Sequence, residues 1–230
     1  MTVKGILSKV ELIETHAIFL LLLSTIVLLL TLKKIIRKKK NEFYLWAIVL
    51  YIFLITVQLL IGLYYQFVAP EIQGKQSPTN ISAYIFVVLE YSIFALLLSK
   101  FIHSTAVEKY LPFSCILFGV AAILVWRSNS SFYKAFSVET AIESISLIPF
   151  CLYYFFELLN NPPLLKLTSE PAFWITTGIL FLFICITPYY LVFDYFKNIN
   201  EMQMIDFFGY DLVVLFLAKA SFTKSKSANG

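Results

Sequence analysis

Charged residues are scarce in this chain. Asp, Glu, Lys and Arg make up 14% of its 230 residues, against about 25% in an ordinary globular domain. Hydrophobic residues make up 60% of the chain, and no long polar segment interrupts them. The composition excludes an ordinary soluble domain. It predicts that residues 1–230 form one membrane domain, with no soluble enzyme domain attached.

Cysteine and histidine are also rare, which limits the metal and redox chemistry to be expected. The three cysteines, Cys115, Cys151 and Cys185, lie inside apolar runs and show no CxxC spacing. They are predicted to be small buried residues, not zinc ligands or disulfide partners. The two histidines, His16 and His103, are expected on opposite sides of the membrane. We therefore expect no metal and no cofactor.

Sequence motifs of the common catalytic sites are missing as well. The chain contains no HExxH, no GxSxG, no GxGxxG and no GxxxxGK. It therefore lacks the ligand pairs and loops of zinc proteases, serine hydrolases and nucleotide-binding proteins. From this we predict that the protein is not an enzyme.

Long apolar runs are present instead, and the first of them sets the predicted topology. Residues 17–32 carry no charge, and six cations follow within eight residues. Lys and Arg near the end of a span stay on the cytoplasmic side of the membrane, so the N-terminus is predicted to lie outside. The six cations are expected to contact anionic lipid head groups; they are Lys33, Lys34, Arg37, Lys38, Lys39 and Lys40.

The apolar runs predict an all-α polytopic membrane protein, a bundle of seven transmembrane helices with the C-terminus inside. Each run can cross a hydrocarbon core of ~30 Å, and the segment before residue 17 is expected at the outer interface. Twelve of the 18 Lys and Arg residues then lie inside and six outside, as the positive-inside rule requires. The predicted helices cover residues 17–36, 43–68, 81–102, 111–126, 135–159, 172–195 and 205–222.

Acidic residues within the predicted spans are the candidate site: Glu90, Glu139, Glu143, Asp206 and Asp211. Charges inside a span are costly and often functional. Glu139 and Glu143 are four residues apart and so share one helical face. In the predicted orientation the five acids lie in the outer half of the bilayer, which suggests an outward-facing cavity for a ligand or cation. A second interpretation stays open, in which the carboxyls are solvated, or protonated and hydrogen-bonded.

The stretch Leu167–Phe183 contains Pro171, Phe173 and Trp174. It resembles a stretch of uncharacterised bacterial seven-helix membrane proteins, in which a short inside loop leads through Pro and Phe-Trp into the sixth helix. Glu90 in the third predicted helix also fits that family. Asp206 and Asp211 depart from it, because mostly apolar and Asn-like residues are expected there. The resemblance implies a seven-helix fold and a bacterial inner-membrane location, but no reaction.

Two hypotheses about function follow. The first is a non-enzymatic, sensor-like or scaffold module that relays to a protein partner within or beneath the membrane. The second is a small transporter, a cation- or proton-coupled carrier that uses the acidic residues. Membrane lipids are expected as partners in both cases. The net charge of +4 is small and unevenly placed. This distribution indicates the orientation of the chain in the membrane, and no nucleic-acid partner is expected.

Overall fold

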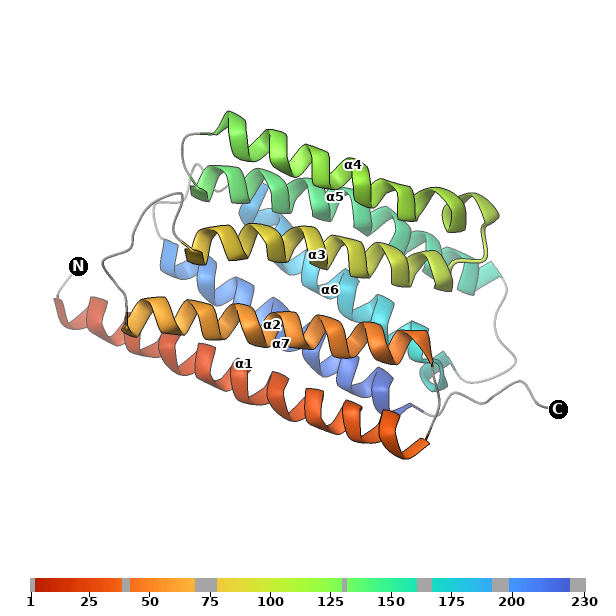
Figure 1. Ribbon diagram of the computed structural model, residues 1–230, viewed down its shortest axis with the longest axis horizontal. Helices are drawn as coiled ribbons and strands as arrows, with labels where there is room; N and C mark the ends of the chain where they lie inside the picture. The colour runs from red at the N-terminus through yellow and green to blue at the C-terminus, as the bar shows by residue number, and fades with distance from the viewer. Residues whose placement is uncertain are drawn as a thin grey trace.

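The computed structural model describes residues 3–38, 42–68, 78–129, 132–160, 167–191 and 199–223, and these ranges are helical with short connections (Figure 1). They contain seven α-helices, one 3₁₀ turn and no strand, which confirms the all-α class. The elements are α1 (Val3–Lys38), α2 (Phe43–Phe67), α3 (Pro78–Phe101), α4 (Thr105–Ser128), α5 (Phe132–Asn160), η1 (Leu167–Ser169), α6 (Pro171–Leu191) and α7 (Ile199–Phe222).

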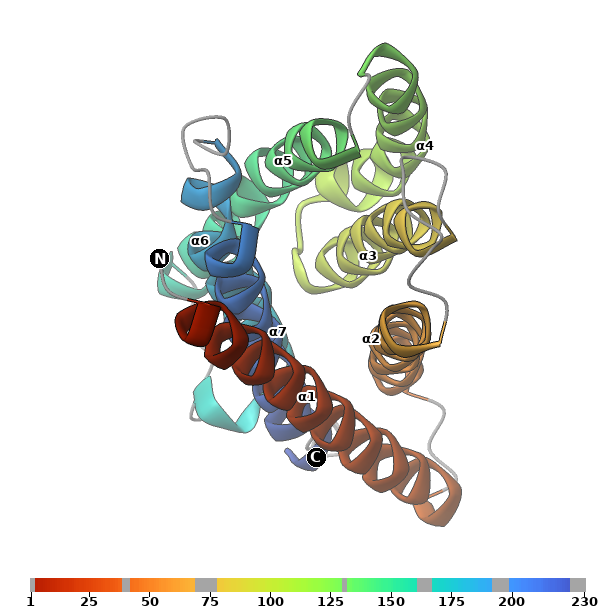
Figure 2. The same cartoon turned by 90° about the vertical axis from the view of Figure 1, so that its left-hand side faces the viewer.

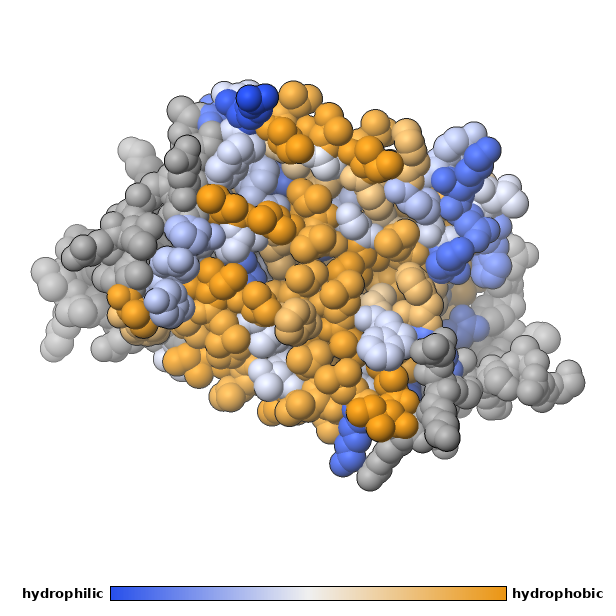
Figure 3. All heavy atoms as spheres, in the orientation of Figure 1, coloured by the Kyte–Doolittle hydropathy of each residue, from blue (hydrophilic) through white to orange (hydrophobic). Residues whose placement is uncertain are grey.

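Within the described ranges, six helices are long and apolar enough to cross a membrane, and these are α1 to α6. Many large apolar side chains face outward, where a soluble protein would place polar ones. Isoleucines and leucines of α4 are typical: Ile116, Ile123 and Leu124 are each more than half exposed. Figure 3 shows the apolar surface as a band, with hydrophilic residues gathered toward the helix ends. The protein is therefore an integral membrane protein.

Six of the described helices form a closed ring, and the remaining one, α4, packs outside it. Going around the ring, the neighbours are α1, α2, α3, α5, α6 and α7, and α7 returns to α1 (Figure 2). Helix α4 lies outside, against α3 and α5. The most buried large side chains point into the ring, among them Tyr51, Phe94 and Phe183, which are at most 1% exposed.

Three helices begin well before their predicted bounds, and one of them is α7, which begins at Ile199, six residues before the predicted start at 205. Helix α1 is continuous over 36 residues, about 54 Å at 1.5 Å per residue. The segment before residue 17 therefore continues the helix, and the stretch apolar enough to span a membrane begins at Thr15. Helix α4 begins at Thr105, six residues before the predicted start at 111. Residues from Thr105 onward, which were expected in an inside turn, are therefore helical.

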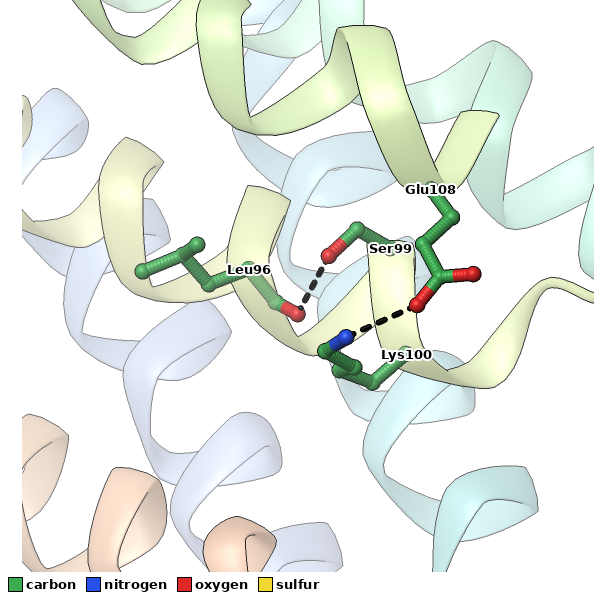
Figure 4. A network of polar contacts seen from close by, with 4 residues as sticks. All are labelled: Leu96, Ser99, Lys100 and Glu108. Atoms are coloured by element: carbon green, nitrogen blue, oxygen red, sulfur yellow. Dashed lines mark hydrogen bonds and ion pairs between the residues drawn. The ribbon is translucent and has the colours of Figure 1, made fainter. Parts of the chain in front are cut away.

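The first turn of α4 is held by its own hydrogen bonds and by an ion pair to α3, which explains its early start. The backbone N–H of Glu108 donates to the carbonyl of Ser104 at 2.9 Å. The Glu108 carboxylate lies 2.8 Å from Nζ of Lys100, in the last turn of α3 (Figure 4). Pro112 lies inside the helix, in its second turn.

Helices α6 and α7 approach each other closely at two glycines. A Cβ on Gly178 would lie 2.9 Å from Cβ of Phe216, and a Cβ on Gly209 would lie 3.0 Å from Cδ1 of Leu182. Small residues let membrane helices approach until their backbones nearly touch, which increases van der Waals contact. This contact helps to hold α7 in the ring.

Candidate functional site

Glu90 lies near the middle of α3 and connects three helices. Its carboxyl is 1% exposed. The hydroxyl of Tyr51 on α2 donates a hydrogen bond to Oε1 at 2.5 Å, and the hydroxyl of Tyr210 on α7 donates to Oε2 at 3.2 Å. The carboxyl group of Glu90 therefore joins α3 to both α2 and α7.

Aromatic packing holds the two tyrosines in place. Phe86 and Phe94 lie one turn before and one turn after Glu90, on the same face of α3. The Tyr51 ring packs against Phe94, with 4.7 Å between ring centroids, and Tyr210 makes an edge contact with Phe86 at 6.0 Å. These contacts position the tyrosine hydroxyls against the carboxyl.

Glu139 and Glu143 of α5 are the other members of the acid cluster, which we define as Glu90, Glu139 and Glu143. They are 1% and 0% exposed, in agreement with the shared helical face that their spacing predicts. Glu143 lies close enough to interact electrostatically with both Glu90 and Glu139. Within the described ranges, no carboxyl oxygen of Glu139 or Glu143 has a hydrogen-bond partner. A buried polar group without a partner is costly.

Buried hydroxyl groups lie on α3, α5 and α6, and one of them is close to the acid cluster. Tyr84 of α3 lies within range of the Glu139 carboxyl, although its hydroxyl donates to the carbonyl of Ala122 at 3.0 Å. Thr140 and Thr176 are 4% and 0% exposed. Their Oγ1 atoms have no partner within the described part of the chain. The interior of the ring therefore holds more buried polar atoms than its own hydrogen bonds satisfy.

Asp211, which was expected in one cavity with Glu90 and Glu143, has its closest described polar contact on α1. Its Oδ2 lies 2.8 Å from Nε2 of His16 on α1, and the two side chains are 13% and 34% exposed. The imidazole of His16 also packs near the ring of Phe207, with centroids 5.8 Å apart. Asp211 and His16 therefore form a second polar contact, between α7 and α1.

The remaining predicted site residues are placed as follows. Asp206 lies on α7, but its side chain falls outside the described part of the chain. The three residues of the acid cluster are buried. The cavity that opens from them to the outside of the membrane stays a prediction. Among the described side chains, no group of three or more His, Cys, Asp or Glu residues is arranged to hold a metal ion.

The basic segment contains one residue with an additional structural role. Nζ of Lys34 donates to the carbonyl of Ser221 and, at 3.3 Å, to that of Thr223. A cation at the end of a helix satisfies carbonyls that have no partner in the helix itself. Lys33 is exposed on the same turn. The side chains of Arg37 and Lys38, and residues Lys39 and Lys40 as a whole, lie outside the described ranges.

Tyr51 and Tyr210 were missed by the sequence analysis. Neither was singled out, and tyrosine in a membrane protein is most often an interface anchor. Their distance from the helix ends was the available signal: Tyr51 lies eight residues beyond Phe43, the first residue of α2. A buried tyrosine hydroxyl usually has a hydrogen-bond partner, so a tyrosine in mid-span points to a polar group nearby.

The stretch from Leu167 to Phe183 has a packing role at the start of α6. Nε1 of Trp174 donates to the carbonyl of Thr168 at 2.9 Å, and the Trp174 ring stacks on Phe216 of α7 at 6.0 Å.

No family model, no curated protein and no solved structure matches the chain. Function is therefore argued from the geometry of the ring and the acid cluster.

Proposed function

We propose that the protein is a non-enzymatic, sensor-like or scaffold module that spans a bacterial inner membrane seven times. It relays a change at its acid cluster to a protein partner within or beneath the membrane. The observation that carries this proposal is Glu90, which joins α2, α3 and α7 through two tyrosine hydroxyls and lies beside the unpartnered Glu143. The bacterial location is supported by the resemblance of Leu167–Phe183.

The position of α7 supports a seventh span. Helix α7 has 24 residues, enough for about 36 Å at 1.5 Å per residue. It lies in the ring between α6 and α1. Asp211 and Tyr210 both have polar partners on neighbouring helices, which lowers the free-energy cost of placing Asp211 in the membrane.

The distribution of basic residues supports the proposed orientation. Lys34 of α1 reaches the C-terminal end of α7, so these two helices run in the same direction. Lys100 and Lys219 lie in the last turns of α3 and α7, at that same end (Figure 1). Arg127, in the last turn of α4, lies at the other end. The end with more cations is assigned to the cytoplasm.

Reporter fusions test this topology. We expect fusions after Lys40, Lys109, Pro163 and Gly230 to report a cytoplasmic location, because each follows an odd number of proposed spans or lies in an inside connection. Alkaline phosphatase and a fluorescent protein, compared at each point, provide the measurement. A periplasmic location for the fusion after Gly230 would contradict the seventh span.

The proposed relay depends on the proximity of two buried carboxyls. Ionisable groups that interact strongly titrate as a unit, so a change of charge at Glu143 alters the state of Glu90. Glu90 in turn accepts hydrogen bonds from α2 and α7. Gain or loss of a proton, or of a bound cation, therefore changes how three helices of the ring are held together.

Replacing Glu143 with Gln tests the relay. Glutamine keeps the shape and hydrogen-bonding capacity of the side chain but removes its charge. We expect Glu143→Gln and Glu90→Gln to fold and to melt about like the wild type at one pH, but to reduce the change in melting temperature between pH 5 and pH 8.5, because proton linkage to the folded state is lost. The measurement is a series of thermal melts in detergent. Glu108→Gln, on the exposed Lys100–Glu108 pair, is the matched control and should keep the wild-type response. Equal pH responses in Glu143→Gln and the wild type would count against the relay.

A small proton- or cation-coupled carrier is the second candidate, favoured by the unpartnered oxygens of Glu139 and Glu143. Flux assays in liposomes separate the two functions. Flux that depends on a proton gradient and disappears in Glu143→Gln would support the carrier and overturn the module. A pH-dependent melting temperature without flux would support the module.

A further inference from the structure

A half-open groove lies between α5 and α6, away from the acid cluster. Its volume is about 270 Å³, which is below the usual ~300–1,000 Å³ of pockets that enclose a small molecule. Its mouth is lined by Lys134, in the first turn of α5, and its far end by Ile145. We call this feature the α5–α6 groove.

The α5–α6 groove owes its depth to small residues on its floor. Ser137 and Ala141 are four residues apart on α5 and are 6% and 8% exposed. The Ser137 hydroxyl is turned toward α6, where it donates to the carbonyl of Tyr190 at 2.7 Å. Val138 and Ile142, which are 37% and 38% exposed, stand beside this floor as a wall. The result is a narrow apolar channel along α5.

The length of the α5–α6 groove corresponds to one leaflet of a bilayer. Lys134 and Ile145 are eleven residues apart, which is about 16 Å along a helix and about half of a ~30 Å hydrocarbon core. A cation thus lies at the water-facing end, and apolar side chains continue from it toward the middle of the membrane.

We propose that the α5–α6 groove binds an anionic phospholipid of this leaflet. The ammonium group of Lys134 contacts the phosphate region, and one acyl chain lies along Val138, Ile142 and Ile145 over the floor of Ser137 and Ala141. Among the described residues that line the groove, the charged one is the cation Lys134. It favours anionic over zwitterionic head groups, because a basic residue near the membrane surface attracts anionic lipid. The exposed apolar side chains of Val138 and Ile142 flank the groove, as expected of a surface that faces the bilayer, from which a lipid can enter directly. This assignment is independent of the acid cluster.

Competition between two phospholipids tests the assignment. The full-length protein, purified in detergent, is incubated with an equal mixture of phosphatidylglycerol and phosphatidylcholine, and the bound lipids are counted by native mass spectrometry. We expect the wild type to retain phosphatidylglycerol preferentially. Lys134→Gln should lower this preference about fivefold, the effect of one basic residue at a membrane surface. Arg127→Gln, an exposed cation at the same end of the bundle but outside the groove, should keep the wild-type preference.

A second variant tests the acyl-chain part of the groove. Ala141→Leu fills the floor and should reduce the retention of both lipids, whereas Lys134→Gln affects only the anionic one. If Ala141→Leu does not fold, as judged by its thermal melt, the Lys134→Gln and Arg127→Gln pair still decides the head-group assignment. Equal preferences in Lys134→Gln and Arg127→Gln would overturn the proposal. Displacement of phosphatidylglycerol by millimolar glycerol phosphate would also overturn it, because the head group alone would then be the ligand.

Discussion

Glu90→Leu is expected to lower the free energy of unfolding by about 2–4 kcal/mol. The substitution removes the acceptor of two tyrosine hydroxyls, and a buried donor left without a partner costs about 1–3 kcal/mol. Tyr51 is 1% exposed and has no route to water, so most of the loss comes from its hydroxyl. The loss is measured by denaturant unfolding in mixed micelles, followed by tryptophan fluorescence.

A double-mutant cycle separates the lost hydrogen bond from other effects of the leucine. The double variant Glu90→Leu with Tyr51→Phe removes both partners, and this is nearly neutral in comparison with removing one. The double variant should therefore be more stable than Glu90→Leu alone. Additive losses from the two substitutions would show that the Tyr51–Glu90 contact does not contribute to stability.

Patterns local in the sequence predicted much of the fold. The apolar runs located α2, α3, α5 and α6 closely, because a span needs a minimum length of hydrophobic residues. The spacing of Glu139 and Glu143 predicted their common face. The predicted start of α4 was wrong, because the first turn of this helix is held by the Lys100–Glu108 ion pair with α3. The apolar pattern of either helix alone does not indicate such a pair.

Partners that are distant in the sequence were not predictable in this way. Tyr51 and Tyr210 lie 39 and 120 residues from Glu90, and no periodicity connects such positions. The position of Asp211 follows from helical geometry once Tyr210 is placed. Successive residues on an α-helix point about 100° apart, since 3.6 residues make one turn. When Tyr210 faces Glu90, Asp211 is turned toward another neighbour, and α1 presents His16 there.

The glycine contact between α6 and α7 was invisible for a related reason. A GxxxG pattern places two small residues on one helix, but here Gly178 and Gly209 lie on different helices. Each looks like an isolated glycine in an apolar run, as does Gly119 on α4. Only the structure separates them: a Cβ on Gly119 would meet nothing within 4 Å, whereas a Cβ on Gly178 would meet Phe216 at 2.9 Å.

Gly178→Leu is expected to lower the free energy of unfolding by about 3 kcal/mol, at the upper end of the usual effect of overpacking a core. The neighbouring atom is the Cβ of Phe216, which is attached directly to the backbone of α7. No side-chain rotation can relieve the contact, so α6 and α7 must move apart. Because α7 closes the ring between α6 and α1, this separation also weakens the α1–α7 contact of His16 with Asp211.

A graded series with a matched control makes this expectation specific. Gly178→Ala introduces the Cβ alone and should lose about 1–2 kcal/mol, less than Gly178→Leu. Gly119→Ala and Gly119→Leu make the same changes in another apolar helix and should stay within about 0.5 kcal/mol of the wild type or gain stability, because both residues favour helix over glycine. Denaturant unfolding of the four variants in the same micelles gives the comparison. Equal losses of unfolding free energy at Gly178 and Gly119 would contradict this expectation. They would show that the close approach of α6 and α7 does not add to the stability of the ring.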